Sequence, residues 1–200
     1  MIAALLLGVC FAQTVHDRYA EKDVAALRQQ LATAPAREDS LLVRYRLYAL
    51  TRERPLIAQL PEDLAEAAPR ELALLSAMWA WRIPGSAPWN AIRLGRRSVR
   101  LLDRALVAAP ADHLIQLIEA QSLIFRPGIA GGDVRQAIAR LRALRTQVED
   151  AGCDVSSVEV DYWLWYALAK SGDSAAAAAR ERLLASRPPP LYVEMLDAEF

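Results

Sequence analysis

Two helix–turn–helix corners of similar sequence constrain the fold of this chain more than any other feature. One lies within residues 123–144 and the other within residues 162–190. Each contains a Gly-Asp pair, Gly132-Asp133 or Gly172-Asp173. Glycine tolerates the positive φ that ends a helix, and aspartate can accept a hydrogen bond from a free amide at the start of the next helix. The pattern therefore predicts a stack of antiparallel helical hairpins.

Small residues follow each corner at the same distance. Ala137 and Ala177 stand five positions beyond their glycines, where a small side chain lets the second helix pack closely against the first. Ser98 holds the corresponding place in an earlier helix, which ends before Pro110. Apolar spacing and capping residues predict further helices. The expected helices cover residues 14–31, 39–54, 71–82, 89–109, 113–125, 133–148, 158–170, 175–186 and 191–197.

Length and charge exclude several classes of protein. The chain has 200 residues, enough for one domain with a continuous core or for about four stacked hairpins. Its formal net charge is +0 and 54% of its residues are hydrophobic. A disordered chain would be less hydrophobic, and a nucleic-acid-binding protein would carry a net positive charge. We therefore expect a folded, all-α protein that does not bind nucleic acid.

The N-terminal residues are typical of a secretory signal. Residues 2–11 form an apolar run that is too short to span a bilayer but long enough for a signal-peptide core. Cleavage after Ala12 would make residues 1–12 a signal peptide and place the mature chain in the periplasm or cell envelope. Two alternatives stay open: lipidation at Cys10, or an ordinary buried N-terminal helix. None of the three includes an integral membrane span.

The sequence contains no arrangement of residues that is typical of an enzyme. His16 and His113 lack a second metal ligand at a suitable spacing, and Cys153 has no recognisable activating partner. Residues 128–133 resemble a glycine-rich phosphate loop, but they follow a predicted helix and lack the Lys-Ser/Thr pair of such loops. We therefore expect no catalytic residue, no metal and no cofactor.

The corner pattern resembles the tetratricopeptide repeat family, in particular its exported bacterial members. That family combines a glycine at the turn, an alanine five residues later, further apolar residues and a closing proline in a period of about 34 residues. Gly172, Ala177, Leu184 and Pro189 follow this order, although the period is longer here. The resemblance covers residues 71–190. It implies an α-solenoid with a right-handed superhelix, formed by residues 13–200, in which residues 13–54 make a capping hairpin.

The resemblance also implies where a ligand binds. In such repeats, the first helix of each hairpin faces a concave groove that holds a peptide or protein partner. Carried over to this chain, the groove-facing residues are Glu159, Tyr162, Trp163, Tyr166, Lys170, Leu117 and Gln121. The family reading thus predicts a non-enzymatic scaffold. One alternative is a small-ligand-binding accessory protein of a periplasmic solute transporter, and another is that residues 191–200 fold over the aromatic side chains and bury them.

A row of arginines marks one side of the helix expected at residues 89–109. Its members are Arg93, Arg96, Arg97, Arg100 and Arg104. Steps of three and four residues keep side chains on one face of a helix. The row is either a solvated face or a docking patch for an acidic partner.

Overall fold

Every regular element of the described chain is a helix, as the sequence predicts. The computed structural model describes residues 2–61, 66–148 and 155–198, with side chains from Phe11 onward. No β-strand occurs in those ranges. Cys10 and Cys153 lie outside the described side chains. The helices are α1 (Ile2–Ala20), α2 (Val24–Thr33), α3 (Arg37–Thr51), α4 (Pro55–Ala58), α5 (Pro69–Ala80), α6 (Pro88–Ala108), α7 (His113–Phe125), a 3-10 turn (Gly128–Ala130), α8 (Val134–Val148), α9 (Ser157–Lys170), α10 (Ala175–Ala185) and α11 (Pro190–Asp197).

The two Gly-Asp corners share one hydrogen bond, although the first corner is longer. The Asp133 amide donates to the Leu123 carbonyl at 3.1 Å, and the Asp173 amide donates to the Leu168 carbonyl at 3.0 Å. Both bonds satisfy a carbonyl near the end of the preceding helix, where the helix itself offers no amide partner. The carboxylate of Asp133 then accepts from the Gln136 amide at 3.0 Å. The predicted capping role of Asp133 is therefore confirmed.

The glycine with positive φ in the first corner is not the predicted one. Gly131 adopts φ 86°, whereas Gly172 supplies the positive φ of the second corner, at 70°. Gly132 is needed for a different reason, because a Cβ atom there would lie 1.8 Å from the Arg126 carbonyl oxygen. The inserted residues thus require two glycines, one for its conformation and one for its lack of a side chain.

The N-terminal unit contains one helix more than expected. The predicted helix over residues 14–31 is interrupted between α1 and α2, where Lys22 adopts φ 60°. Asp23 then caps α2, since its carboxylate accepts from the Ala26 amide at 3.0 Å. The expectation of a two-helix capping hairpin is therefore wrong. Asp23, which lies inside the predicted helix, indicates this break, because aspartate is favoured at helix N-termini over helix interiors.

The predicted close-packing position of α10 is also wrong. Ala137 is completely buried in α8, as expected, but Ala177 is exposed and Ala179 is the buried alanine of α10. Helix α10 begins two residues after its Gly-Asp pair, while α8 begins one residue after. One additional residue rotates a helix by about 100° relative to the corner. Helix α10 starts with five successive alanines, so its sequence shows no alternation of apolar and polar residues from which this shift could have been predicted.

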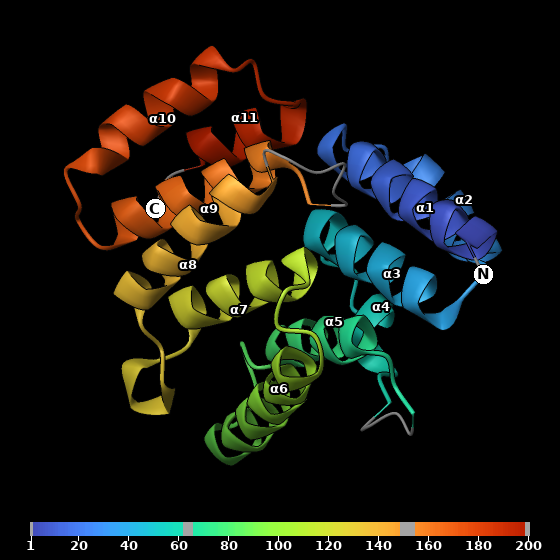
Figure 1. Ribbon diagram of the computed structural model, residues 1–200. Coiled ribbons are helices and arrows are strands. Elements are labelled where there is room, and N and C mark those ends of the chain that lie inside the picture. Colours follow the sequence, from blue (N-terminus) through green and yellow to red (C-terminus); the bar gives the residue numbers. More distant parts are fainter. Residues whose placement is uncertain (1, 62–65, 149–154, 199–200) are drawn as a thin grey trace.

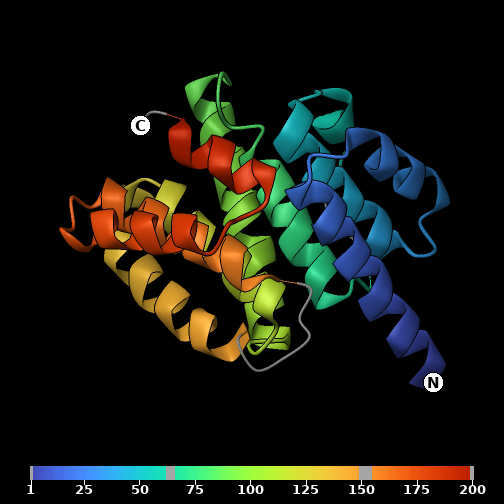
Figure 2. The same ribbon diagram turned by 90° about the horizontal axis from the view of Figure 1, so that it is seen from above.

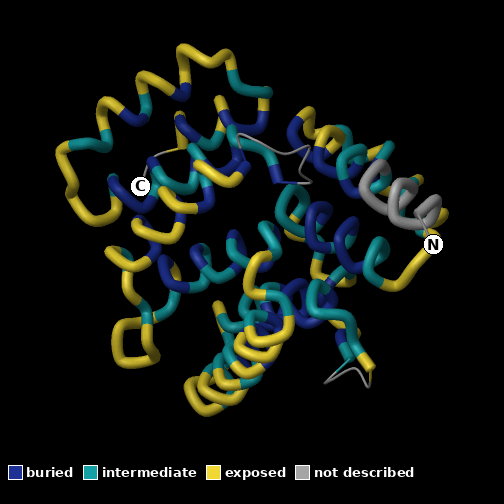
Figure 3. Tube along the Cα trace, in the orientation of Figure 1, coloured by how far each residue is buried: buried dark blue, intermediate teal, exposed yellow. Residues whose placement is uncertain are grey.

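The odd-numbered helices form a closed ring. Contacts join α1 to α3, α3 to α5, α5 to α7, α7 to α9, α9 to α11, and α11 back to α1. In two views, α11 lies next to the end of α1 (Figure 1 and Figure 2). Helix α2 packs on α1 and α3, α6 on α5 and α7, α8 on α7 and α9, and α10 on α9. The first and last helices of the chain therefore meet, and buried residues are concentrated where the ring helices face one another (Figure 3).

Candidate functional site

The structure divides the predicted partner-binding residues into an inner and an outer group. Helix α9 carries five of them and α7 the other two. Glu159, Tyr162 and Leu117 are buried, with exposed fractions of 1%, 4% and 0%. Trp163 and Tyr166 are partly exposed, and Lys170 is exposed. The prediction that all these side chains contact a partner is therefore wrong for the inner three, because the chain itself surrounds them.

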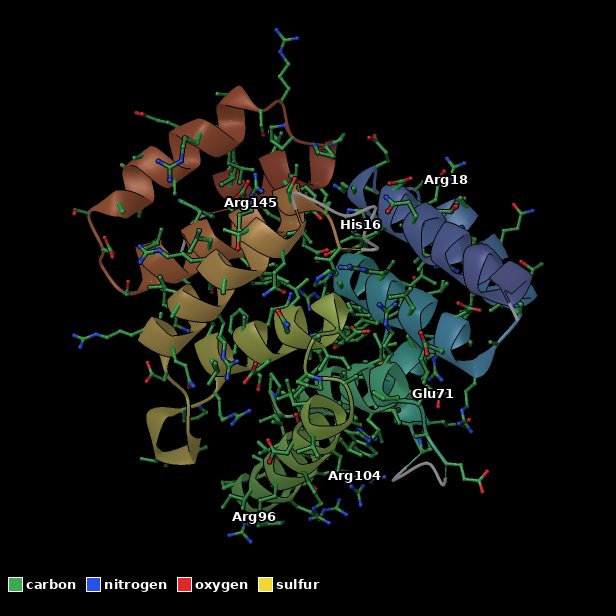
Figure 4. All side chains as sticks on the ribbon, in the orientation of Figure 1. His16, Arg18, Glu71, Arg96, Arg104 and Arg145 are labelled. Carbon is green, nitrogen blue, oxygen red and sulfur yellow. The ribbon has the colours of Figure 1, made fainter. Side chains whose placement is uncertain are left out.

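A buried ion pair occupies the centre of the inner group. The Arg46 guanidinium on α3 forms two hydrogen bonds with the Glu159 carboxylate on α9, at 2.5 and 2.8 Å. The His16 Nδ1 atom on α1 lies 3.4 Å from Glu159 Oε2. We call His16, Arg46 and Glu159 the central polar cluster. It joins three helices of the ring, and His16 is labelled where α1 faces this interior (Figure 4).

The electrostatics of the central polar cluster favour a charged carboxylate. Burial alone would raise the pKa of the Glu159 carboxyl group, but the charge and hydrogen bonds of Arg46, together with the nearby His16, outweigh this effect and lower the pKa to about 2. A carboxylate of this kind is a poor proton donor or acceptor near neutral pH. The pair therefore connects helices and is not suited to acid–base chemistry.

Four tyrosines surround the central polar cluster. Their rings are all almost completely buried, and they come from four ring helices: Tyr19, Tyr45, Tyr162 and Tyr192. The Arg46 guanidinium lies over the Tyr19 ring at 4.5 Å and near the Tyr45 ring at 5.3 Å. Burial raises the pKa of the Tyr19 hydroxyl to about 12, so this phenol stays protonated. Aromatic faces thus complete the surroundings of the buried cation.

Gln121 belongs to the inner group through its hydrogen bond. Its side-chain oxygen accepts from the Tyr45 hydroxyl at 3.0 Å, and the Gln121 side chain is partly buried. Tyr45 also stacks on Trp81, with ring centroids 4.8 Å apart. Gln121 therefore has an intramolecular partner on α3, and its side chain contributes to the contacts between α3 and α7.

The outer group forms an aromatic cluster on the surface between α7 and α9. Phe125, the last residue of α7, is 54% exposed. Its ring lies 5.9 Å from Trp163 in an edge-on arrangement and 5.5 Å from Tyr166. Trp163 and Tyr166 are themselves 5.6 Å apart. We call Phe125, Trp163 and Tyr166 the aromatic cluster, and Phe125 is the member that sequence reasoning missed.

Lys170 links the two helices beside the aromatic cluster. Its ammonium group donates to the Ile124 carbonyl at 2.8 Å and lies 5.1 Å from the centre of the Phe125 ring. A cation near the last carbonyls of a helix interacts favourably with the helix dipole. Lys170 thus stabilises the end of α7 and holds Phe125 in place, while its side chain stays exposed.

The described residues offer no recognisable metal centre. Within residues 11–61, 66–148 and 155–198, no group of three or more His, Cys, Asp or Glu side chains is arranged to hold a metal ion. None of the described helices is both long and apolar enough to cross a membrane.

Of the predicted site residues, Lys170 is exposed and Trp163, Tyr166 and Gln121 are partly exposed. Two of these, Trp163 and Tyr166, belong to the aromatic cluster. Comparison of the chain with protein-family models, with curated proteins and with solved structures found no match.

Proposed function

We propose that this protein is a non-enzymatic, TPR-like helical scaffold of the cell envelope that binds a peptide or protein partner. The aromatic cluster is the contact surface. The observation that carries the proposal is the position of Phe125, which is 54% exposed although Trp163 and Tyr166 lie within 6 Å of its ring centroid. A single exposed apolar residue is ordinary, but neighbouring aromatic rings at a surface are typical of binding anchors.

The physical reason is contact area. Aromatic side chains bury a large surface in a complex and lose few rotamers, because only two torsions are fixed. The rings of the aromatic cluster already restrain one another, and Lys170 holds Phe125 from the side. A partner would therefore meet a surface that is largely preorganised, with an ammonium group close by for a carboxylate or a carbonyl.

The repeat-like features support the scaffold part of the proposal. Both Gly-Asp corners use the same backbone hydrogen bond, and Ala137 packs as the small residue of a tight hairpin. In this proposal, the solenoid's inner face is filled by the chain's own central polar cluster and tyrosines. The partner consequently binds outside that interior, on the aromatic cluster.

Export of the mature chain is part of the same proposal. Cleavage after Ala12 would leave Val15, His16 and Tyr19, which are all buried, in the shortened α1. N-terminal sequencing of protein from the native cell envelope tests this. Gln13 as the first residue supports cleavage, a lipid-modified Cys10 supports the anchored alternative, and an intact Met1 on cytosolic protein contradicts export.

A site-specific crosslink tests the binding surface. A photoreactive phenylalanine analogue at position 125 should crosslink to a partner in the native envelope, whereas the same analogue at Ala178, an exposed position on α10, should not. Trp163→Ala should reduce the crosslink while leaving the helical circular-dichroism signal nearly unchanged.

The matched structural control is Trp165→Ala. Trp165 is only 6% exposed, so its truncation should destabilise the fold by about 3–5 kcal/mol. If Trp163→Ala unfolds the protein as readily as Trp165→Ala, the aromatic cluster is a structural element and the binding proposal fails. A small molecule that copurifies with the folded chain, in place of a polypeptide, would instead favour the accessory role in solute transport.

A further inference from the structure

Helix α6 has a surface that the proposed function does not use. One side of this helix packs on α5 through five buried residues: Leu94, Ser98, Leu101, Leu102 and Ala105. The opposite side projects from the body and is largely exposed (Figure 1 and Figure 3). Three large apolar residues there are open to solvent: Trp89 is 77% exposed, Ile92 58% and Val107 85%.

Arginines share the exposed side of α6 with these apolar residues. Successive helical residues are about 100° apart, so steps of three, four and seven return to one line along the helix. Such a line, directly opposite the buried residues, contains Trp89, Arg93, Arg96, Arg100, Asp103 and Val107, which we call the α6 ridge; its three arginines outnumber its one acidic residue. Arg96 is labelled at the outer margin of α6 (Figure 4).

The α6 ridge concentrates positive charge in a chain that is neutral overall. Helix α6 carries five arginines and a single acidic residue, Asp103, whereas the whole chain has a formal net charge of +0. The Arg93 guanidinium donates to the side-chain oxygen of Asn90, which is uncharged, at 2.8 Å. The guanidinium charge of Arg93 is therefore not neutralised by that contact.

Contact with water explains why arginines lie on this face of α6, but it does not explain the exposed apolar residues beside them. A helix face that only contacts water has no physical reason to carry a tryptophan that is 77% exposed at the start of an arginine row. Tryptophan is enriched at membrane–water interfaces, and arginine binds phosphate through two parallel hydrogen bonds. Together, the two residue types fit a surface of anionic lipid headgroups.

We propose that the α6 ridge docks this protein on an anionic phospholipid surface. Arg93, Arg96 and Arg100 contact lipid phosphates, and Trp89 and Ile92 enter the headgroup layer. The shape of the ridge favours a membrane over an acidic polypeptide. The ridge runs along the outside of the helix for about 27 Å. A flat surface can therefore touch its whole length at once, whereas a polypeptide would need a groove of the same length to enclose the ridge.

Flotation with lipid vesicles tests the proposal. The wild-type chain should float with vesicles that contain phosphatidylglycerol and should stay behind with pure phosphatidylcholine. Added salt should weaken the binding, because exposed charges are screened. The double variant Arg96→Gln, Arg100→Gln should bind about 25-fold more weakly, since each basic residue near an anionic surface contributes roughly fivefold. Adding Trp89→Ala to this double variant should weaken binding further.

The matched control removes the same charge elsewhere. Arg135 and Arg142 are exposed on α8, so Arg135→Gln, Arg142→Gln should keep nearly wild-type binding. All variants should retain the helical circular-dichroism signal, because the substituted side chains are exposed. Absence of binding to anionic vesicles, equal binding to neutral ones, or equal losses in both double variants would overturn the proposal. So would binding to polyglutamate without binding to vesicles, which would indicate an acidic polypeptide instead.

Discussion

At the scale of single residues, Arg46 and Glu159 are the two charged groups whose pairing matters most for stability. Their exposed fractions are 2% and 1%, and they join α3 to α9 across the ring. An ion pair at this depth is not by itself strongly stabilising, because both groups lose their hydration. Loss of one partner is different, since the other charge is then buried without compensation. The pair therefore determines which helices can face one another.

Arg46→Met should destabilise the protein by about 3–5 kcal/mol, because the Glu159 carboxylate is then unpaired in the core. Urea unfolding measures the change. The double variant Arg46→Met, Glu159→Leu should lose less stability than Arg46→Met alone. Arg28→Met is the exposed control: the Arg28 side chain is 58% exposed in its pair with Glu53, so less than about 1 kcal/mol should be lost. Similar losses in Arg46→Met and Arg28→Met would contradict the central role of the buried pair.

The pKa of Glu159 predicts how stability depends on acid. Burial by itself would raise this pKa, but the opposite effect of Arg46 and His16 is larger. The pKa is therefore lowered from 4.5 to about 2. Between these values, the unfolded chain binds a proton that the folded chain does not bind. The free energy of unfolding should therefore fall as pH is lowered through this interval. Urea titrations at several pH values measure the decline. Glu159→Gln, although less stable throughout, should show a shallower decline, and an unchanged slope would refute the assignment.

At the scale of elements, the Gly-Asp corners determine how each hairpin is closed. Leu123 and Leu168 accept equivalent hydrogen bonds from the aspartate amides, even though the first corner contains an insertion. The helix that follows can start directly after the aspartate or one residue later. This small difference decides which alanine meets the preceding helix, and it separates Ala137 from Ala177.

Substitutions at these two alanines should therefore have unequal effects. Ala137→Leu should destabilise the protein by about 1–3 kcal/mol, because Ala137 is completely buried and a larger side chain must push α8 away. Ala177→Leu should change stability by less than about 0.5 kcal/mol, because Ala177 is exposed. Unfolding midpoints in urea give the comparison. Equal midpoints for the two variants would show that the helix packing described for α8 or α10 is wrong.

At the scale of the whole molecule, α11 closes the ring. Its Tyr192 is 1% exposed and lies 6.0 Å from the Tyr162 ring on α9. On its outer side, Glu194 pairs with Lys22, which follows α1. The helix thus contacts both neighbours at the point where the first and last parts of the chain meet. Contacts between residues so distant in sequence form only when the complete chain has folded.

Tyr192→Ala should destabilise the protein by about 3–5 kcal/mol, as expected for truncation of a buried aromatic side chain. It should also open the ring locally, so that amide hydrogen exchange accelerates in α1 and α11 more than in α5. Val193→Ala, beside it on α11 and 37% exposed, should cost less than about 1 kcal/mol. Uniform acceleration across all helices would show that α11 is not a separate closing element.

Much of the local structure was predictable from the sequence. The bounds of α7 and the capping role of Asp112 follow from apolar spacing and from one residue with a suitable side chain. The arginine row on α6 was likewise visible as a helical pattern; four of its members are exposed, and Arg97 is half-buried over the Trp79 ring. These features depend on residues within a few positions of one another, so they can be predicted from the sequence alone.

The candidate site was only partly predictable, because burial depends on residues that are distant in the sequence. Glu159 was assigned to a partner by the periodicity of its own helix, yet Arg46, 113 positions away, binds it. Tyr162 was assigned in the same way and is covered by Tyr192. Phe125 and Trp89 are exposed because no other described part of the chain packs over them, and no local pattern encodes that. The sequence by itself determined the helices and their corners. Only the tertiary structure decided which side chains stay accessible, since the packing of the ring brings residues of the first and last helices into one interior.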